Sequence, residues 1–164
     1  MSASAGQVLT AAQYNKDTRS GLAFYERGTT SSNFTSSAAV GIQRVNNVPC
    51  VAGEPVQITY FGHPDSTVGT DNIRTEVRVN SAGVATASST LINPSRAFGA
   101  ASASHRCVTF VYTPSVTANH SFALCGARET GSGTANFYAG DSVRKTQLSV
   151  RQFSDGNHAG GENL

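Results

Sequence analysis

The sequence contains no tryptophan, one methionine, three cysteines and few charged residues, which make up 13% of its 164 residues. It has no apolar run near the roughly 18 residues that a membrane-spanning helix needs. Its basic side chains are scattered, whereas nucleic-acid binding proteins gather them into a patch or stripe. We therefore expect neither a membrane nor a nucleic acid as a partner.

Motifs that carry catalysis or cofactor binding are also missing. There is no nucleophile elbow, phosphate-binding loop, dinucleotide fingerprint or zinc-protease helix. The cysteines form no C-x-x-C pair and the four histidines have no ligand spacing. We therefore expect no catalytic residues, no cofactor and no metal. A carboxylate pair that meets only in the fold is the one enzymatic alternative.

The composition that is present favours strands and tight turns. Ser and Thr together outnumber the charged residues, and Gly reaches 16. Such a mixture is typical of β-rich domains. A chain of this length forms one domain that buries roughly 70% of its unfolded surface. The formal charge is +2, and Arg far outnumbers Lys, which suits planar polar contacts in an interface but equally fits compositional bias.

The N-terminus carries the clearest helix start. Thr10 is a candidate N-cap, Gln13 completes a capping box with it, and Leu9 is placed to pack against Tyr14. The helix would belong to an N-terminal arm, residues 1–21. It is either a lid on one end of the sheet or a docking element, and we assign these four side chains to docking.

Short segments with strand-like alternation follow in a domain over residues 22–154. About seven or eight strands with turns between them predict an all-β, jelly-roll-like β-sandwich. The polar tail, residues 155–164, is expected to be ordered only against a neighbour. The predicted strands are residues 22–27, 39–45, 56–61, 73–79, 84–91, 106–112, 119–127 and 146–153, with a Gly-rich loop at 126–134 and a turn-rich connection at 63–72.

The strongest hairpin signal joins residues 106–112 to residues 119–127. If the turn is centred on Val116, large apolar side chains face each other on one side of the ladder. A slip of one residue would turn both apolar rows to the opposite face. The predicted cross-strand pairs are Phe110 with Phe122, Val108 with Leu124 and Cys107 with Cys125.

The cysteine pair in this register has two interpretations. Cys107 and Cys125 could form a cross-strand disulfide after release from the cell, having started as thiols in the cytosol. The alternative is that they are small, partly buried residues, with Cys50 a third of the same kind.

Three charged residues alternate along the predicted strand at 73–79. Arg74, Glu76 and Arg78 share one face, and the strand's apolar residues and Thr75 share the other. A solvated face is one interpretation. The other is a subunit contact, in which Arg74 and Arg78 are interface residues.

The first residues, 1–7, lack the apolar run of a secretory signal. We therefore expect synthesis in the host cytosol, although the composition is similar to that of extracellular β modules. A virion protein that is assembled inside the cell and later exposed on the outer particle surface satisfies both observations.

Two segments carry a family resemblance. Residues 5–15, AGQVLTAAQYN, resemble the opening of short minor tail and virion appendage proteins of tailed phages that infect actinobacteria. Residues 113–115, TPS, and 127–134, ARETGSGT, resemble the hairpin and Gly-rich loop of the same family. The resemblance implies a β-sandwich, often homotrimeric, with a structural role and no catalysis.

These observations predict a bacteriophage virion structural protein without enzymatic activity. It would be a capsid decoration (cement) protein or a minor tail or fibre component. Its expected partners are further copies in a homotrimer and the major capsid or tail proteins. The alternative is a module that recognises host cell-wall glycan through nearby Arg and one of four tyrosines, Tyr25, Tyr60, Tyr112 or Tyr138.

Overall fold

The computed structural model describes residues 23–27, 32–98, 106–138 and 146–152, and these form ten strands and no helix. The predicted N-terminal helix with Leu9, Thr10, Gln13 and Tyr14, and the tail at 155–164, lie outside the described residues. The strands are β1 (Ala23–Arg27), β2 (Ser32–Phe34), β3 (Val40–Cys50), β4 (Val56–Ser66), β5 (Asn72–Asn80), β6 (Thr90–Phe98), β7 (Arg106–Tyr112), β8 (Ala118–Thr130), β9 (Ala135–Tyr138) and β10 (Gln147–Gln152).

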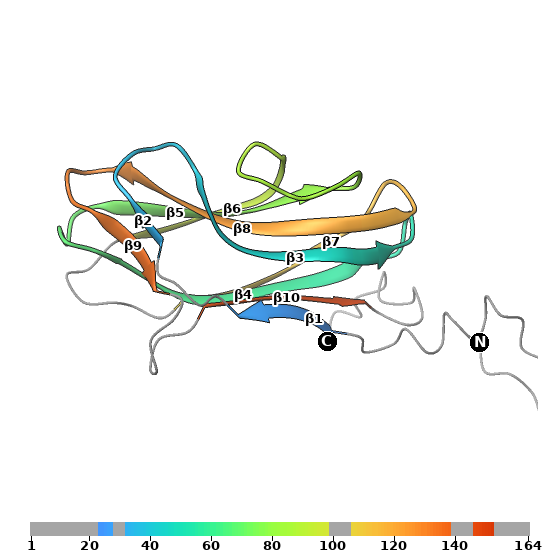
Figure 1. Cartoon of the computed structure of the whole chain (residues 1–164). Coiled ribbons are helices and arrows are strands. Elements are labelled where there is room, and N and C mark those ends of the chain that lie inside the picture. Colours follow the sequence, from blue (N-terminus) through green and yellow to red (C-terminus); the bar gives the residue numbers. More distant parts are fainter. Residues whose placement is uncertain (1–22, 28–31, 99–105, 139–145, 153–164) are drawn as a thin grey trace, which may run out of the picture.

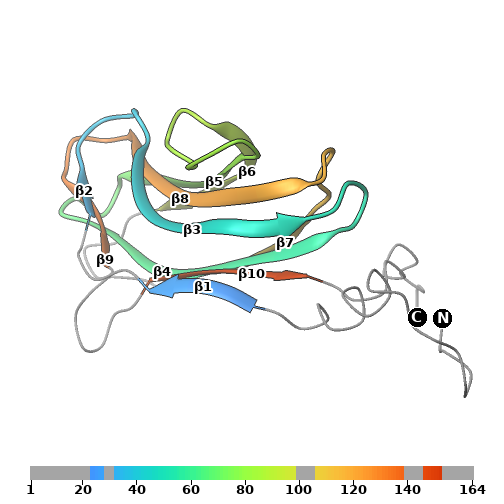
Figure 2. The ribbon, with the colours of Figure 1, turned by 45° about the vertical axis from the view of Figure 1, so that its right-hand side comes forward.

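The strands form two antiparallel sheets that pack face to face, which confirms the predicted all-β sandwich (Figures 1 and 2). One sheet has the order β3-β8-β5-β6. The other has the order β1-β10-β4-β9-β2, and β7 also pairs with β4. The long strand β4 connects the two parts of this sheet. Its first part pairs with β10 and β7, and its last part pairs with β9.

Five of the antiparallel pairs are nested along the chain. The innermost pair is the β5–β6 hairpin, and around it lie β4 with β7, β3 with β8, β2 with β9, and β1 with β10. From the inside outwards the first three pairs alternate between the two sheets, and the two outermost pairs both belong to the six-stranded sheet. The long separations in sequence mean that most of the ladder contacts are non-local.

The core lies between the sheets and is built from alternate residues of each strand. On the six-stranded sheet, Phe110, Ile58 and Val150 form one row across β7, β4 and β10. On the facing sheet Phe122 and Leu124 are fully buried. Alternation of apolar and polar residues produces this arrangement because successive strand side chains point to opposite faces.

A buried polar contact joins the two sheets. The Tyr60 hydroxyl lies 2.6 Å from Thr75 Oγ1, and both residues are buried. The hydrogen bond satisfies two polar groups that would be costly to bury alone.

The predicted hairpin between residues 106–112 and 119–127 is wrong. Both strands exist, but β7 pairs with β4 and β8 pairs with β3 and β5, so they belong to different sheets. Phe110 is opposite Ile58, and Phe122 is opposite Val45 and Val79. The apolar faces were predicted correctly: they meet across the sandwich interior instead of along one ladder.

Several strand limits also differ from the prediction. The segment at 84–91 is a strand only from Thr90, and residues 81–89 fold back over the outer face of the four-stranded sheet (Figures 1 and 2). β8 continues to Thr130 and β4 to Ser66, each through part of a segment predicted to be a loop. These extensions pair with neighbouring strands, and tertiary pairing overrides the local Gly- and Pro-rich composition.

Candidate functional site

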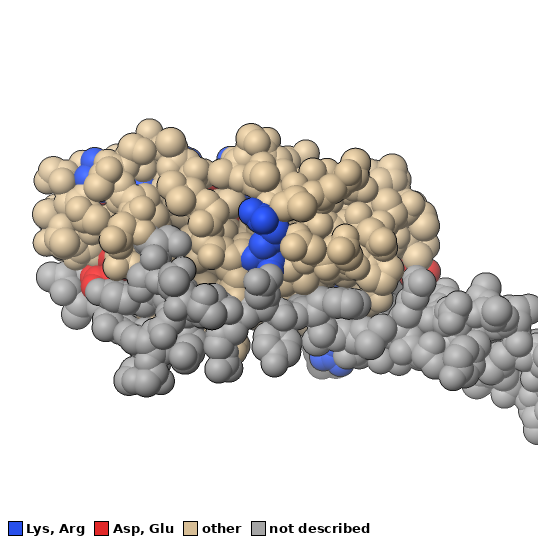
Figure 3. All heavy atoms as spheres, in the orientation of Figure 1, with Lys and Arg blue, Asp and Glu red and all other residues tan. Residues whose placement is uncertain are grey.

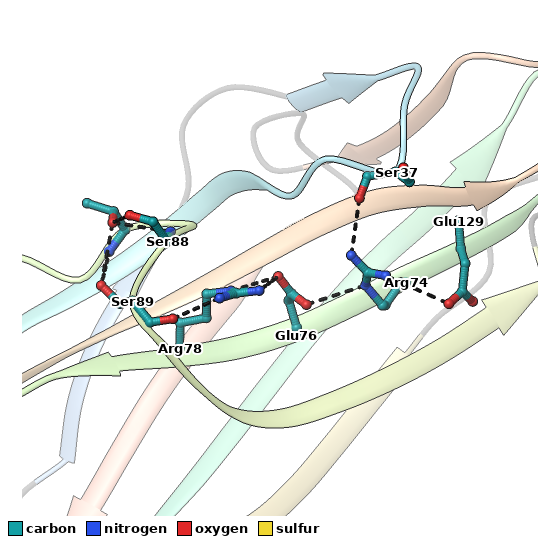
Figure 4. Close-up of polar contacts among 8 residues, drawn as sticks. Ser37, Arg74, Glu76, Arg78, Ser88, Ser89 and Glu129 are labelled. Carbon is teal, nitrogen blue, oxygen red and sulfur yellow. Dashed lines mark hydrogen bonds and ion pairs between the residues drawn. The ribbon is translucent and has the colours of Figure 1, made fainter.

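The two arginines predicted to be interface residues lie in an internal ion-pair network. Arg78 Nη2 is 2.7 Å from Glu76 Oε1, and Arg74 Nε is 3.3 Å from Glu76 Oε2. Arg74 also pairs with Glu129 at 3.7 Å. Figure 4 shows these side chains in one line along the outer face of the sheet. Glu76 is 1% exposed, so it is held between two guanidinium groups.

The chain itself covers part of this network. Arg78 donates to the Ser89 carbonyl at 2.8 Å, and Arg74 donates to the Ser37 carbonyl at 3.2 Å (Figure 4). Ala85 is fully buried and packs against Ala123 and Cys125 of β8. The face is therefore not a fully solvated surface, because residues 81–89 fold over part of it. A subunit contact through Arg74 and Arg78 stays a prediction.

The predicted pairing of Cys107 with Cys125 is wrong, because β7 and β8 belong to different sheets. Cys107 lies opposite Phe61 on β4 and is exposed, whereas Cys125 lies opposite Glu76 on β5 and is buried. The two cysteines lie in different sheets, and all three cysteines are free thiols. Burial raises the pKa of the Cys125 thiol to about 11, with Glu76 adding to the shift. Burial likewise raises the pKa of Cys50 to about 11.

The Gly-rich loop after β8 is anchored on the buried carboxylate of Asp71. Ser66 Oγ donates to Asp71 Oδ2 at 2.6 Å, and the Gly133 and Ser132 amides donate to the carboxylate at 3.0 and 3.1 Å. These hydrogen bonds, led by that of Ser66, lower the pKa of Asp71. The loop amides thus donate their hydrogen bonds to a carboxylate of the chain itself, Asp71, as expected for a structural turn.

An open groove of about 640 Å³ lies where the β5–β6 connection meets the β7–β8 turn. Most of its lining side chains carry hydroxyl or amide groups, and the described lining includes no Asp, Glu, Lys or Arg. The lining residues are Val79, Asn80, Ser81, Val84, Thr86, Ser88, Ser89, Thr90, Tyr112, Ser115, Val116 and His120.

One of the four tyrosines considered for glycan binding lines this groove. Tyr112 packs edge-on against Phe122 and His120, with ring centroids 5.9 and 6.2 Å away. Tyr60 is 1% exposed, so the prediction that it could contact a glycan at the surface is wrong. The side chains of Tyr25 and Tyr138 lie outside the described part of the structure.

The outer face of the six-stranded sheet differs from that of the four-stranded sheet. On β7, Cys107, Thr109 and Val111 point outward and are exposed, and Val111 is 59% exposed. Figure 3 views the sandwich from the edges of its two sheets, and the described surface on this side is mostly uncharged, with Lys/Arg atoms near its centre.

The described residues contain neither a cluster of metal ligands nor a membrane-spanning helix. No group of three or more His, Cys, Asp or Glu side chains is placed to hold a metal ion in this part of the chain. No helix there is long and apolar enough to cross a membrane.

Comparison with known proteins yields similarity in fold. No protein-family model matches the chain. No curated protein matches it either. Among solved structures, Eiger TNF from S. frugiperda has a TM-score of 0.51 at 10% identity, covering 88% of this chain and 100% of that chain.

Two further solved structures are less similar. The infectious bursal disease virus VP2 subviral particle has a TM-score of 0.46 at 7% identity, covering 81% of this chain and 37% of that chain. The EclA C-terminal domain, a sugar-binding protein, has a TM-score of 0.43 at 11% identity, covering 77% and 80%. At 10% identity the likeness to Eiger TNF concerns the fold alone, and the strand topology defines the class of fold, a two-sheet β-sandwich.

Proposed function

We propose that this chain is a structural protein of a bacteriophage particle, displayed on its outside as a capsid decoration protein or a minor tail or fibre component. The observation that carries the proposal is the set of five nested strand pairs, which supports a jelly roll. Jelly rolls recur in viral shell proteins and lectins. Because a fold hosts many functions, the assignment to a phage particle rests on the resemblance of residues 5–15 and 127–134.

Labelling of intact particles tests this proposal. Antibody against the purified chain should decorate phage particles in electron micrographs, and quantitative mass spectrometry should find the chain in purified virions. Hundreds of copies per particle would support decoration, and a few to tens would support a tail component. Particles that lack the chain by both measurements would overturn the proposal.

We also propose that the chain assembles as a homotrimer. A sandwich has open sheet edges, and assembly around a threefold axis would cover some of them. The outward row of β7 with exposed Val111 is the best-placed contact surface. Sedimentation should give a trimer at micromolar concentration, and Val111→Glu should weaken it more than Val40→Glu on β3. A monomeric wild-type chain would disprove the trimer.

A second candidate function is recognition of host cell-wall glycan. The favouring observation is the open groove that contains the Tyr112 ring. Purified host cell walls should retain the chain, and Tyr112→Phe, which keeps the ring packing, should reduce retention. Equal amounts of chain bound to walls and to an inert resin would exclude this candidate.

A further inference from the structure

The groove described above has two walls that are distant in sequence. One wall is residues 79–90, from the end of β5 to the start of β6, and the other is residues 112–120, from the end of β7 to the start of β8. The β5–β6 connection and the β7–β8 turn thus meet at one end of the sandwich. Their side chains give the groove its chemical character.

The first wall is held in place by its own hydroxyl groups and by the sheet. The Thr86 amide donates to Ser89 Oγ at 2.9 Å, and Thr86 Oγ1 lies 2.9 Å from Ser88 Oγ. Asn80 Nδ2 donates to the Val84 carbonyl at 3.0 Å. Buried Ala85 holds the same segment against β8. The wall is therefore formed before any ligand arrives.

The second wall is tied to the neighbouring β3–β4 turn. The Gly53 amide donates to the Pro114 carbonyl at 2.9 Å, and the Ala52 amide donates to Thr117 Oγ1 at 3.0 Å. The Tyr112 ring packs on buried Phe122. Two anchored walls lower the ordering cost that a ligand would otherwise meet.

The polar groups of the groove are neutral and of mixed hydrogen-bonding character. Each Ser or Thr hydroxyl donates one hydrogen bond and accepts two, so the bonds within the first wall leave capacity for a ligand. Without a cationic side chain in the described lining, the groove lacks the charge-assisted bonds that hold anions. An apolar ligand would cover these hydroxyl and amide groups without giving them hydrogen-bond partners.

The groove also offers apolar surface at its edges. Val84 is 51% exposed and Val116 is 47% exposed, and they stand on opposite walls. Tyr112 adds an aromatic ring with a polar tip. A ligand with many hydroxyl groups around C–H faces matches both kinds of surface.

We infer that this groove is a binding site for a neutral saccharide. Hydroxyl groups of Ser88 and Ser115 bond the sugar from the two walls, and Val84, Val116 and Tyr112 contact its C–H faces. The inference rests on the second candidate function above, and it adds the place of the site and the chemical class of the ligand.

Titration of the isotope-labelled full chain with short neutral oligosaccharides of glucose, galactose or N-acetylglucosamine, followed by NMR, tests the site. At least one should shift the amides of residues 79–90 and 112–120, and an oligogalacturonate should bind more weakly. The double variant Ser88→Ala/Ser115→Ala should weaken binding about tenfold, since each lost hydroxyl removes one hydrogen bond. The matched control Ser36→Ala/Ser37→Ala alters two exposed serines outside the groove and should bind as wild type.

A second pair of variants keeps the test independent of hydroxyl removal. Val116→Lys adds a long charged side chain at the groove edge and should reduce binding, whereas Val40→Lys on β3 should not. No shift with any neutral oligosaccharide, shifts confined to other residues, or tighter binding of the oligogalacturonate would overturn the inference. Retention on cell walls that is unchanged in both groove variants would refute the site while leaving wall recognition standing.

Discussion

Arg78 contacts Glu76 through two nitrogens, since Nε and Nη2 both lie 2.7 Å from Glu76 Oε1. The carboxylate is almost fully buried, while the Arg78 side chain is 18% exposed. Arg74 approaches the other carboxylate oxygen. Glu76 therefore lies between two guanidinium groups at the outer face of the four-stranded sheet, and Glu129 also pairs with that of Arg74.

Replacing this glutamate should destabilise the fold. Glu76→Gln leaves Arg74 and Arg78 facing each other with one negative charge fewer, and we expect the free energy of unfolding to fall by about 2 kcal/mol. Glu129→Gln, which removes a longer and more exposed ion pair, should cost less than about 1 kcal/mol. Urea denaturation of both variants measures the difference. Equal effects would contradict the central position of Glu76.

The Gly-rich loop should tolerate no side chain at Gly131. Its φ is 111°, and an added Cβ would overlap Asp71 Oδ1. We expect Gly131→Ala to lower the free energy of unfolding by about 3 kcal/mol. Gly53 has a φ of 80° but open space around its Cβ position, so Gly53→Ala should cost only about 1 kcal/mol. Thermal unfolding of the pair separates steric overlap from backbone strain.

Acid should weaken the anchor of this loop. The Asp71 pKa is lowered in the folded chain, so the carboxylate stabilises the fold above the unfolded pKa of about 4. That contribution is lost as the pH falls from there through the folded pKa. Asp71→Asn should therefore show a smaller loss of stability than wild type between neutral pH and about pH 3. Parallel denaturation curves at the two pH values provide the measurement, and an unchanged acid dependence in the variant would refute it.

The three thiols should differ sharply in reactivity. Cys107 is exposed, whereas Cys50 and Cys125 are buried and have pKa values raised to about 11. At about pH 8 a disulfide reagent should therefore modify one thiol per folded chain quickly, because thiolate is the reactive form. Cys107→Ser should remove the fast phase and Cys125→Ser should leave it. A chain whose mass is lower by two hydrogen atoms, with a disulfide between Cys107 and Cys125, would contradict the assignment of these residues to different sheets.

The sequence does not predict the candidate groove, because its two walls are distant along the chain. Tyr112 was among the tyrosines considered, but the Ser- and Thr-rich segment at 86–90 was predicted to be part of a strand. Its hydroxyls bond to one another in a connection that folds over the sheet. The available signal was the run of hydroxyl residues at 86 and 88–90, which forms turns as readily as it forms strands.

The pattern of residues along the chain is enough to predict an all-β fold and the side chains of β7 and β8 that point inward. Alternation with a period of two is a local property, so Val108 and Phe110 on one strand, and Phe122 and Leu124 on the other, could be assigned to apolar faces. Strand pairing, in contrast, follows from the three-dimensional structure and not from this local pattern. An apolar strand face is satisfied equally by a neighbour in its own ladder or by a facing sheet, and the pairing of β7 with β4 and of β8 with β3 and β5 depends on contacts between residues far apart in the chain.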